Sequence, residues 1–281
     1  MSNKKSKNFS VVMPLYFKEN HEYFAKSLQS LIDQTLQPSE IIIILDGQIG
    51  DDLKKVIDRY KNNEIIKIIK LEKNHGIGYA RRVGIENCST NIFAVMDSDD
   101  ICNIRRFELQ YNKIIEGEFD VIGGYIEEFD EEVGDLSMIR KLPLRNEDIY
   151  KYGKWRMPVN NVTLMFTREV YEMVGGYPDL RSGEDWHLVA KWLANKVKFC
   201  NLDEVLVYVR GGKDMIKRRR TFNFQFHQLK VFPYMYKLKY IGFFHLFANV
   251  LIRLILIIMP TLVTTFLYKK ILKYIKNEDS F

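Results

Sequence analysis

The chain has few cysteines, no internal repeats and no apolar run long enough to identify a membrane span. Each of these absences excludes a class of protein. Among 281 residues there are three cysteines, Cys88, Cys102 and Cys200, an odd number without the spacing of a metal site. We therefore expect reduced thiols in a cytosolic protein rather than a disulfide scaffold. The polar, basic residues 1–7 precede an apolar run that Pro14 interrupts, so we expect no signal peptide. The absence of internal repeats and low-complexity segments excludes repeat architectures.

Acidic residues are scarce in one part of the chain only. Between Arg210 and Lys276 there are 14 lysines and arginines against one acid, Asp214, so this segment carries +13. The formal net charge is +6, and the remainder therefore carries −7. An acidic body is suited to hold a cation, and a basic tail is suited to meet an anionic surface.

Apolar runs alternate with amphipathic stretches over the first hundred residues. Strands are predicted at 9–13 (ended by Pro14), 41–45, 65–71 and 91–95, and helices at 21–34, 51–60 and 77–86. Residues 41–45 are apolar at every position, which favours burial on both faces of a parallel sheet. The alternation predicts an α/β fold, with a mostly parallel central sheet and helices on both faces. Asp46, residues 74–82 and residues 97–100 should then converge at one edge.

The pattern is looser after Asp100. We predict a helix at 105–116, a strand at 121–129, a polar loop over the site at 130–146, a strand at 162–166, a short helix ending at Gly175 and Gly176, a helix at 186–195 and a strand at 205–209. Ser182 or Gly183 is expected near the N-cap of the 186–195 helix, with Glu184 and Asp185 in its first turn.

Three carboxylates, Asp97, Asp99 and Asp100, come within four residues at the end of the predicted 91–95 strand. Such charges are costly to gather without a counter-charge, and a hard divalent cation, Mn²⁺ or Mg²⁺, would supply it through oxygen ligands. That cation could also carry a diphosphate. The alternative is a solvated acidic turn that precedes the helix near Asn103.

Several short motifs follow one another in a fixed order. They are residues 11–16 with Glu19, 30–34, 38–40, Asp46 with Gly47, 73–78 with Ala80 and Arg81, 96–100, 175–177, and Glu184 with Asp185. Together they resemble the family 2 glycosyltransferases, inverting enzymes of GT-A fold that use nucleotide sugars and include bacterial capsule, exopolysaccharide and O-antigen enzymes. The resemblance covers roughly the first 210 residues. Each motif alone is a weak signal, but so many motifs in this order are a strong one.

The resemblance implies a role for each matching residue. On the nucleotide-sugar side, Asp46 would hydrogen-bond the base, Arg81 would lie close to base and ribose, and the other binding positions would be Pro14, Tyr16, Glu19, Asn74, Gly78, Asp97 and Ser98. Asp99 would be a direct metal ligand on the diphosphate, and Asp97 would lie near the ribose and the metal. Glu184 and Asp185 would form the catalytic motif, with Asp185 as the general base. The alternative for this pair is stabilisation of a helix N-terminus.

The sequence departs from the family pattern at several positions. Phe17 replaces the usual Asn, Leu45 replaces one carboxylate of an acidic pair, and Arg82 replaces the usual Asn after Arg81. A Gln/Arg-x-x-Arg-Trp motif of processive synthases is absent, which favours transfer of single sugars. Phe17 and Leu45 also permit a second hypothesis, a non-catalytic nucleotide-sugar-binding or scaffold subunit of a glycan assembly complex.

We expect two parts: a catalytic domain at 1–212, with a nucleotide-sugar half at about 1–100 and an acceptor half at about 101–212, and a helical region at 213–281. The basic cluster 217–220 and its aromatic neighbours are compatible with nucleic-acid binding, but the apolar stretch that follows disfavours it. Between 241 and 258, His245, Asn249 and Arg253 are spaced by four and form one polar stripe.

The uninterrupted apolar run 254–268 is shorter than the roughly 20 residues of a membrane span and contains Pro260. We therefore favour helices lying at the inner face of the cell membrane, with lysines at the headgroups, over a span near 241–268. A third alternative is packing of these helices on the catalytic domain. Attachment at the membrane would bring the site to a lipid-linked saccharide acceptor.

Overall fold

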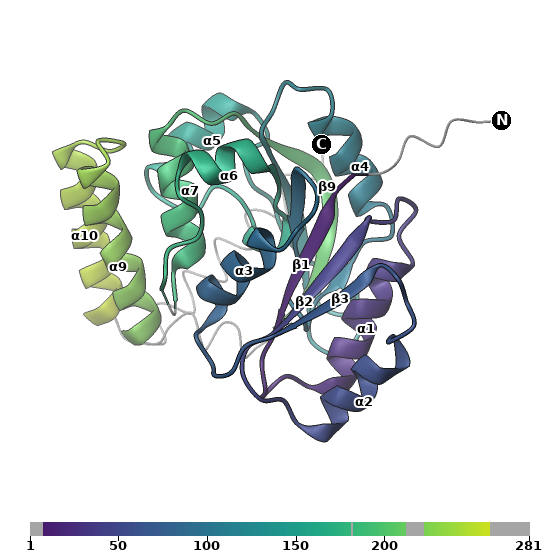
Figure 1. Cartoon of the computed structure of the whole chain (residues 1–281). Coiled ribbons are helices and arrows are strands. Elements are labelled where there is room, and N and C mark those ends of the chain that lie inside the picture. Colours follow the sequence, from purple (N-terminus) through teal and green to yellow (C-terminus); the bar gives the residue numbers. More distant parts are fainter. Residues whose placement is uncertain (1–7, 181, 212–221, 259–281) are drawn as a thin grey trace.

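The computed structural model describes residues 8–180, 182–211 and 222–258 (Figure 1). Its strands are β1 (Ser10–Leu15), β2 (Glu40–Leu45), β3 (Ile66–Lys70), β4 (Ile92–Val95), β5 (Ile101–Cys102), β6 (Val121–Phe129), β7 (Met138–Arg140), β8 (Met165–Thr167) and β9 (Phe199–Arg210). Its helices are α1 (His21–Ile32), α2 (Asp51–Arg59), α3 (Ile77–Glu86), α4 (Arg106–Ile114), α5 (Asn146–Gly153), η1 (Asn161–Thr163), α6 (Arg168–Met173), α7 (Glu184–Ala194), α9 (Phe222–Lys237) and α10 (Phe243–Ile258). The strands form one sheet in the order β3-β2-β1-β4-β8-β6-β9-β5, with β7 paired to β6.

The first four strands of the sheet are parallel, as the sequence predicts: β1 lies between β2 and β4, and β3 pairs with β2. The second half is mixed, because β8 is antiparallel to both β4 and β6 while β6 and β9 are parallel. The parallel half places the ends of β1, β2 and β4 at one edge, which is where the predicted site residues follow.

The first strand does not end at Pro14, contrary to the prediction. Pro14 pairs with Ile44 of β2, and β1 continues to Leu15. Val12 accepts a hydrogen bond from Met96 on the β4 side, and the pairing with β4 ends at Val12. Pro14 has the same orientation as Val12, so its missing N–H falls beyond the last β4 partner and no ladder bond is lost.

The predicted strand at 162–166 and the predicted loop at 130–146 are partly wrong. Residues Asn161–Thr163 form the short helix η1, in which Thr163 Oγ1 donates to the Asn160 carbonyl at 2.7 Å, so β8 begins only at Met165. The 130–146 segment contains β7, which pairs with β6, and it ends where α5 begins. The short strand β5, which pairs with β9, is also absent from the prediction.

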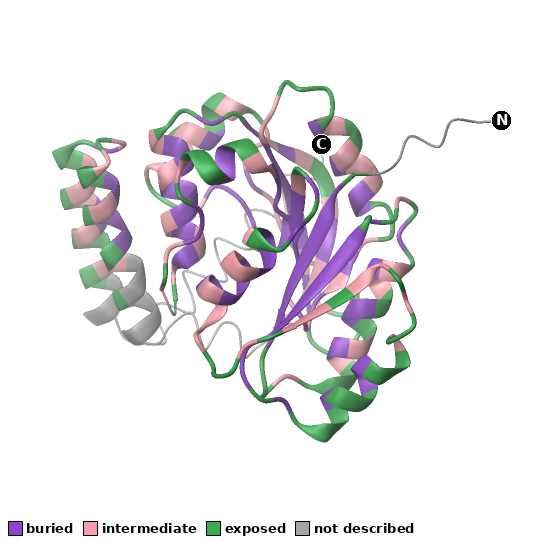
Figure 2. Cartoon of the chain, in the orientation of Figure 1, coloured by how far each residue is buried: buried purple, intermediate pink, exposed green. Residues whose placement is uncertain are grey.

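Two apolar layers cover the sheet, one on each face (Figures 1 and 2). Side chains of α1, α2 and α4 pack with Val11, Met13 and Ile43 on one face. Side chains of α3, α5, α6 and α7 pack with Val12 and Ile44 on the other. Successive side chains of a strand thus pack into the layers on opposite faces of the sheet, which explains why β2 is buried at all positions.

The C-terminal helices α9 and α10 lie side by side next to α7 (Figure 1). Val231, Phe232 and Met235 of α9 form a third apolar cluster with Trp186 and Ala190 of α7. No helix within residues 8–180, 182–211 and 222–258 is long and apolar enough to cross a membrane. The basic cluster 217–220 and the second apolar piece from Pro260 onward lie outside the described residues.

Candidate active site

The acidic turn after β4 is tied to the first strand and the first helix. Ser98 Oγ donates to Glu19 Oε2 at 2.8 Å, and Ser27 Oγ of α1 donates to the Asp97 carbonyl at 3.0 Å. Ser98 is buried, whereas Asp97 and Asp99 are partly exposed. These hydrogen bonds fix the turn, and the side chains of Asp97 and Asp99 reach the surface, so the turn is not a freely solvated helix cap.

Asp100 anchors the other side of the turn to the end of β9. Its Oδ1 accepts from the Arg210 backbone nitrogen at 2.9 Å, and Arg210 Nε donates to the Asp99 carbonyl at 3.4 Å. The guanidinium carbon of Arg210 lies 3.8 Å from the ring centroid of Tyr23, which holds the side chain over the turn. Burial, together with the charges of Asp99 and Asp97, raises the pKa of Asp100 well above its ordinary range.

A buried arginine joins the acidic turn to the first turn of α7. Arg81 is 2% exposed; its Nη2 lies 2.5 Å from Asp97 Oδ1, and its Nη1 lies 2.7 Å from Glu184 Oε1. The Asn161 amide, oriented with its oxygen toward Arg81, accepts from both terminal nitrogens at 3.0 and 3.1 Å. The acidic turn and the motif of Glu184 and Asp185, which lie far apart in the sequence, therefore meet at a single guanidinium.

The charges of this cluster influence one another strongly. Burial opposes the charge of Arg81, but the negative charges of Asp97 and Glu184 raise its pKa above the ordinary value, so it remains a cation. For Glu184, burial favours the neutral acid and Arg81 favours the carboxylate. Burial is the larger effect, and the pKa of Glu184 rises to about 7.

Asp185 lies beside Glu184 but in a different environment. Gly183, at φ +78°, precedes α7 as its N-cap, so Glu184 and Asp185 occupy the first turn as predicted. Glu184 is 4% exposed and turned to Arg81, whereas Asp185 is partly exposed. Asp185 Oδ1 accepts from the backbone nitrogen of Trp186 at 2.7 Å. Of the two carboxylates, Asp185 is the one that an external hydroxyl group can approach.

Asp46 holds the loop between β3 and α3. Its Oδ1 accepts from the backbone nitrogen of His75 at 2.7 Å, and its Oδ2 accepts from the nitrogen of Gly76 and from Asn74 Nδ2, each at 2.9 Å. Asp46 is 3% exposed. The expected convergence of Asp46 with residues 74–82 is thus confirmed, and its carboxylate is occupied by this loop.

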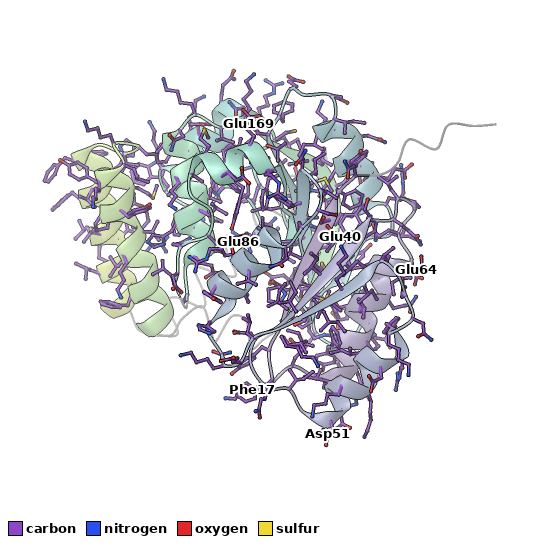
Figure 3. All side chains as sticks on the ribbon, viewed as in Figure 1. Phe17, Glu40, Asp51, Glu64, Glu86 and Glu169 are labelled. Carbon is purple, nitrogen blue, oxygen red and sulfur yellow. The ribbon has the colours of Figure 1, made fainter. Side chains whose placement is uncertain are left out.

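The remaining predicted donor residues differ in accessibility. Pro14 is buried inside β1, whereas Tyr16 and Phe17 are 41% and 47% exposed beyond its end, where Figure 3 labels Phe17. Gly78 is buried in α3, where a Cβ would lie 2.8 Å from the Leu180 carbonyl and 2.9 Å from Glu184 Cβ. Gly78 therefore allows α3 to approach the turn before α7.

Asp97 and Asp99 are the residues of the acidic turn that could share a metal ion with a bound diphosphate. Within the described part of the chain, no group of three or more His, Cys, Asp or Glu side chains could hold a metal. Mg²⁺, however, is commonly bound by one or two carboxylates and completed by substrate phosphates and water. The charges of Asp99 and Asp97 add to burial in raising the pKa of the neighbouring Asp100, so negative charge is concentrated in this turn. These two carboxylates therefore fit a hard cation that also contacts a diphosphate.

Comparison with known proteins shows which family the chain belongs to. The family model of Glycosyl transferase family 2 matches residues 10–173. A UDP-Gal:alpha-D-GlcNAc-diphosphoundecaprenol beta-1,3-galactosyltransferase from Escherichia coli is 34% identical over 266 residues, covering 94% of this chain and 96% of the relative. The amylovoran biosynthesis glycosyltransferase AmsE of Erwinia amylovora is 35% identical over 264 residues, covering 93% of this chain and 98% of the relative. The chain belongs to glycosyl transferase family 2 and is a glycosyltransferase.

Solved structures show the same fold at low sequence identity. S. aureus TarS (residues 1–349), in complex with UDP-GlcNAc, has a TM-score of 0.61 and 22% identity, covering 80% of this chain and 65% of that one. The mannosyltransferase PcManGT from Pyrobaculum calidifontis, in complex with GDP-Man and Mn²⁺, has a TM-score of 0.63 and 13% identity, covering 95% of this chain and 80% of that one. The predicted GT-A fold is thereby confirmed.

One residue of the cluster, Asn161, is absent from the sequence prediction. A second, Arg210, follows the predicted 205–209 strand and is a sequence candidate for reaching the diphosphate, with a solvated basic turn as the alternative. Asn161 contacts Arg81 from η1, and Arg210 contacts the acidic turn from β9. Both come from elements that the hydrophobic pattern placed with the wrong bounds. A signal for Arg210 exists in the sequence, because it is the first cation after the predicted 205–209 strand, but its contact with Asp100 depends on the pairing of β9 with β5.

Proposed function

We propose that this glycosyltransferase is metal-dependent and inverting, and that it moves a single sugar from a nucleotide sugar to a lipid-linked or polysaccharide acceptor in cell-surface glycan biosynthesis. The observation that carries the proposal is the Arg81 bridge, with Asp97 on one side and the first turn of α7, which holds Asp185, on the other. The relative from Escherichia coli, whose name specifies UDP-Gal and a diphosphoundecaprenol-linked sugar, supports a UDP-sugar donor and a lipid-linked acceptor.

The chemistry assigns different tasks to the two ends of the bridge. Asp185 accepts the proton of the acceptor hydroxyl while that oxygen forms its bond to the anomeric carbon. The bond from the anomeric carbon to the diphosphate oxygen breaks on the opposite face, and the nucleoside diphosphate departs. Asp97 and Asp99 would hold Mn²⁺ or Mg²⁺, which when bound supplies positive charge to the leaving diphosphate. Glu184, turned to Arg81, positions the turn that carries Asp185.

We also propose that the catalytic domain has the two halves that the sequence predicts. Residues 1–100 form the nucleotide-sugar half and 101–212 the acceptor half of the catalytic domain. The donor side comprises the exposed Tyr16 and the held residues around Asp46 and Arg81, namely Glu19, Asn74, Gly78 and Ser98.

The base assignment is tested with Asp185→Asn and, as a matched control, Asp179→Asn, an exposed carboxylate in the loop before α7. Hydrolysis of a panel of nucleotide sugars with Mn²⁺ identifies the donor, and transfer is then measured to a polyprenyl-diphosphate-linked sugar. D185N should lose transfer by at least about 100-fold while calorimetry shows unchanged UDP binding. EDTA should stop turnover of the parent enzyme, and added Mn²⁺ should restore it. Full activity of D185N, or UDP binding without any turnover in the parent, would refute the enzymatic scheme.

We further propose that α10 lies on the inner face of the cell membrane. Its apolar side chains are 44–71% exposed, namely Phe243, Phe244, Phe247, Leu251, Ile252, Leu254 and Ile255. The polar stripe faces the protein instead: Asn249 Nδ2 donates to the Lys154 carbonyl at 3.0 Å, and the His245 ring lies 4.9 Å from that of Trp155. A helix with its apolar side outward and the exposed cations Lys237 and Lys239 before it fits an anionic lipid surface.

Flotation of the full chain with phosphatidylethanolamine vesicles, with and without phosphatidylglycerol, tests this attachment. We expect binding that increases with phosphatidylglycerol and is lost in a Phe243→Ser, Phe247→Ser variant. The control is Met173→Ser, which changes an exposed apolar residue on α6. Retention on DNA but not on vesicles would favour the nucleic-acid hypothesis instead.

A further inference from the structure

Helix α7 has two apolar faces, and only one of them packs on the sheet. Leu188, Val189 and Trp192 belong to the layer that covers β1 and β4. Trp186 and Ala190, four residues apart on another side of the helix, pack instead against Val231, Phe232, Met235 and Ile241 of the C-terminal region. α7 is therefore enclosed between the sheet and α9 (Figure 1).

The contact with α9 begins at the residue that follows Asp185. Trp186 is 2% exposed, and its ring lies 5.3 Å from that of Phe232 in an edge-to-face arrangement at 80°. The backbone nitrogen of Trp186 also donates to Asp185 Oδ1 at 2.7 Å. Among the residues that the structure describes, none hydrogen-bonds to the buried indole Nε1, and the contacts that orient this ring there are apolar. A shift of Trp186 would thus move the carboxylate that its backbone holds.

A second contact from α9 reaches the residue after Trp186. The His187 ring lies 4.9 Å from the ring of Tyr234, and its Nδ1 lies 2.7 Å from the Gly183 carbonyl. Gly183 is the left-handed residue that begins α7. The backbone on both sides of Asp185 is therefore connected to side chains that pack on α9.

Phe232 also connects α9 to α10. Phe232 is fully buried, and the guanidinium carbon of Arg253 from α10 lies 5.8 Å from its ring centroid. One aromatic ring thus stands between the helix with the exposed apolar side and the tryptophan beside Asp185.

We infer that Trp186 and Phe232 are positioning residues through which the C-terminal helices orient Asp185. Arg81 holds the first turn of α7 on its polar side through Glu184, and α9 holds it on its apolar side through Trp186. The inference rests on the proposed function, because it takes Asp185 as the base. It assigns to the C-terminal region a part in the reaction that is separate from attachment to lipid.

The test uses the full chain and the variants Phe232→Ala and Phe232→Leu, with Phe226→Ala, a 44% exposed position on the same helix, as the matched control. For each we measure kcat and KM for transfer, the dissociation constant of UDP by calorimetry, and Tm. F232A should lower kcat by between about 10-fold and about 100-fold while KM for the donor and UDP affinity change less than about twofold. F232L should recover most of kcat, and F226A should resemble the parent.

A fall in Tm with unchanged kcat, measured below the Tm of the variant, would overturn the inference, because a structural role alone predicts that result. If F232A does not fold, Trp186→Phe takes its place, and parental kcat in that variant has the same meaning. D185N in the same assay separates this failure from failure of the proposed function. An active D185N removes the base assignment itself, whereas an inactive D185N with a fully active F232A removes only the role of Phe232.

Discussion

Arg81 Nη1 lies 2.7 Å from Glu184 Oε1, although 103 residues separate them in the sequence. The same guanidinium reaches Asp97 with its other terminal nitrogen. Because Arg81 is buried, its position is set by the packing of α3 against α7, and the acidic turn and the first turn of α7 are held at one distance from each other. This relationship determines how substitutions in the site should behave.

Arg81→Met should strongly destabilise the fold. It leaves Glu184 buried without its cation, and loss of one partner of a buried pair costs about 3–5 kcal/mol. The lower end applies, since the Asp97 side chain is 34% exposed and partly screened by water. The neighbouring Arg82→Met serves as control, because its 4.0 Å ion pair with Glu86 is at the surface and should contribute less than about 0.5 kcal/mol. Urea unfolding followed by circular dichroism measures both, and equal losses would contradict the importance of the bridge.

The pH dependence of activity should change near neutrality because of Glu184, whose pKa is about 7. As the pH falls through this value, the carboxylate is protonated and its ion pair with Arg81 weakens, so kcat should fall. Glu184→Gln removes the titrating group, and its kcat should be lower but should show no inflection near pH 7. Profiles from about pH 5 to about pH 9 test this, and an unchanged inflection in E184Q would assign it to another group.

Stability should show the opposite trend. The pKa of Glu184 rises from 4.5 to about 7, so the folded state binds more protons between these values than the unfolded state does. The free energy of unfolding should therefore decrease as the pH rises through this window. E184Q should lack this component, which urea titrations at several pH values can resolve.

Gly78→Ala should impair the site through the backbone. The new Cβ would meet the Leu180 and Pro178 carbonyl oxygens and the Glu184 side chain at 2.8–2.9 Å, so α3 and the start of α7 must separate. Overpacking of this kind costs about 1–3 kcal/mol, against a gain of up to about 1 kcal/mol in helix propensity. Transfer should fall more than stability does. Gly50→Ser, which places a Cβ in open space at the start of α2, should be neutral in both assays.

Asp46→Ala should loosen the loop that precedes α3. It removes the acceptor for the backbone nitrogens of His75 and Gly76, so amide hydrogen exchange at these residues should accelerate. We expect the KM for the donor to rise as the loop moves. The exposed Asp51→Ala, which loses a surface ion pair with Lys54, is the control. If exchange is unchanged while donor KM rises, Asp46 contacts the nucleotide directly rather than through the loop.

Local patterning predicted the parallel half of the fold well. The strands β1, β2 and β4 are short, almost continuously apolar and separated by helices, so their burial follows from the local residue pattern. The strand β3, at the end of the sheet, contains two lysines and has no fully buried residue. The second half was predicted less well. The Thr163 hydroxyl donates a hydrogen bond to the Asn160 carbonyl within the turn that forms η1. The strands β5 and β7 are too short to show a recognisable pattern of alternating apolar and polar residues. Their existence depends on pairing partners distant in the sequence.

The sequence by itself determined the family, the parallel pairing expected of the first four strands and the identity of the acidic motifs, because these depend on short-range patterns of residue type. Only the tertiary structure decided that Arg81 is buried between Asp97 and Glu184, that Asp46 is occupied by the 74–76 loop, and that α10 turns His245 and Asn249 inward and its phenylalanines outward. The physical reason is that burial and charge pairing are properties of neighbours in space. A helical period indicates which residues share a face, but it does not indicate which face meets the protein.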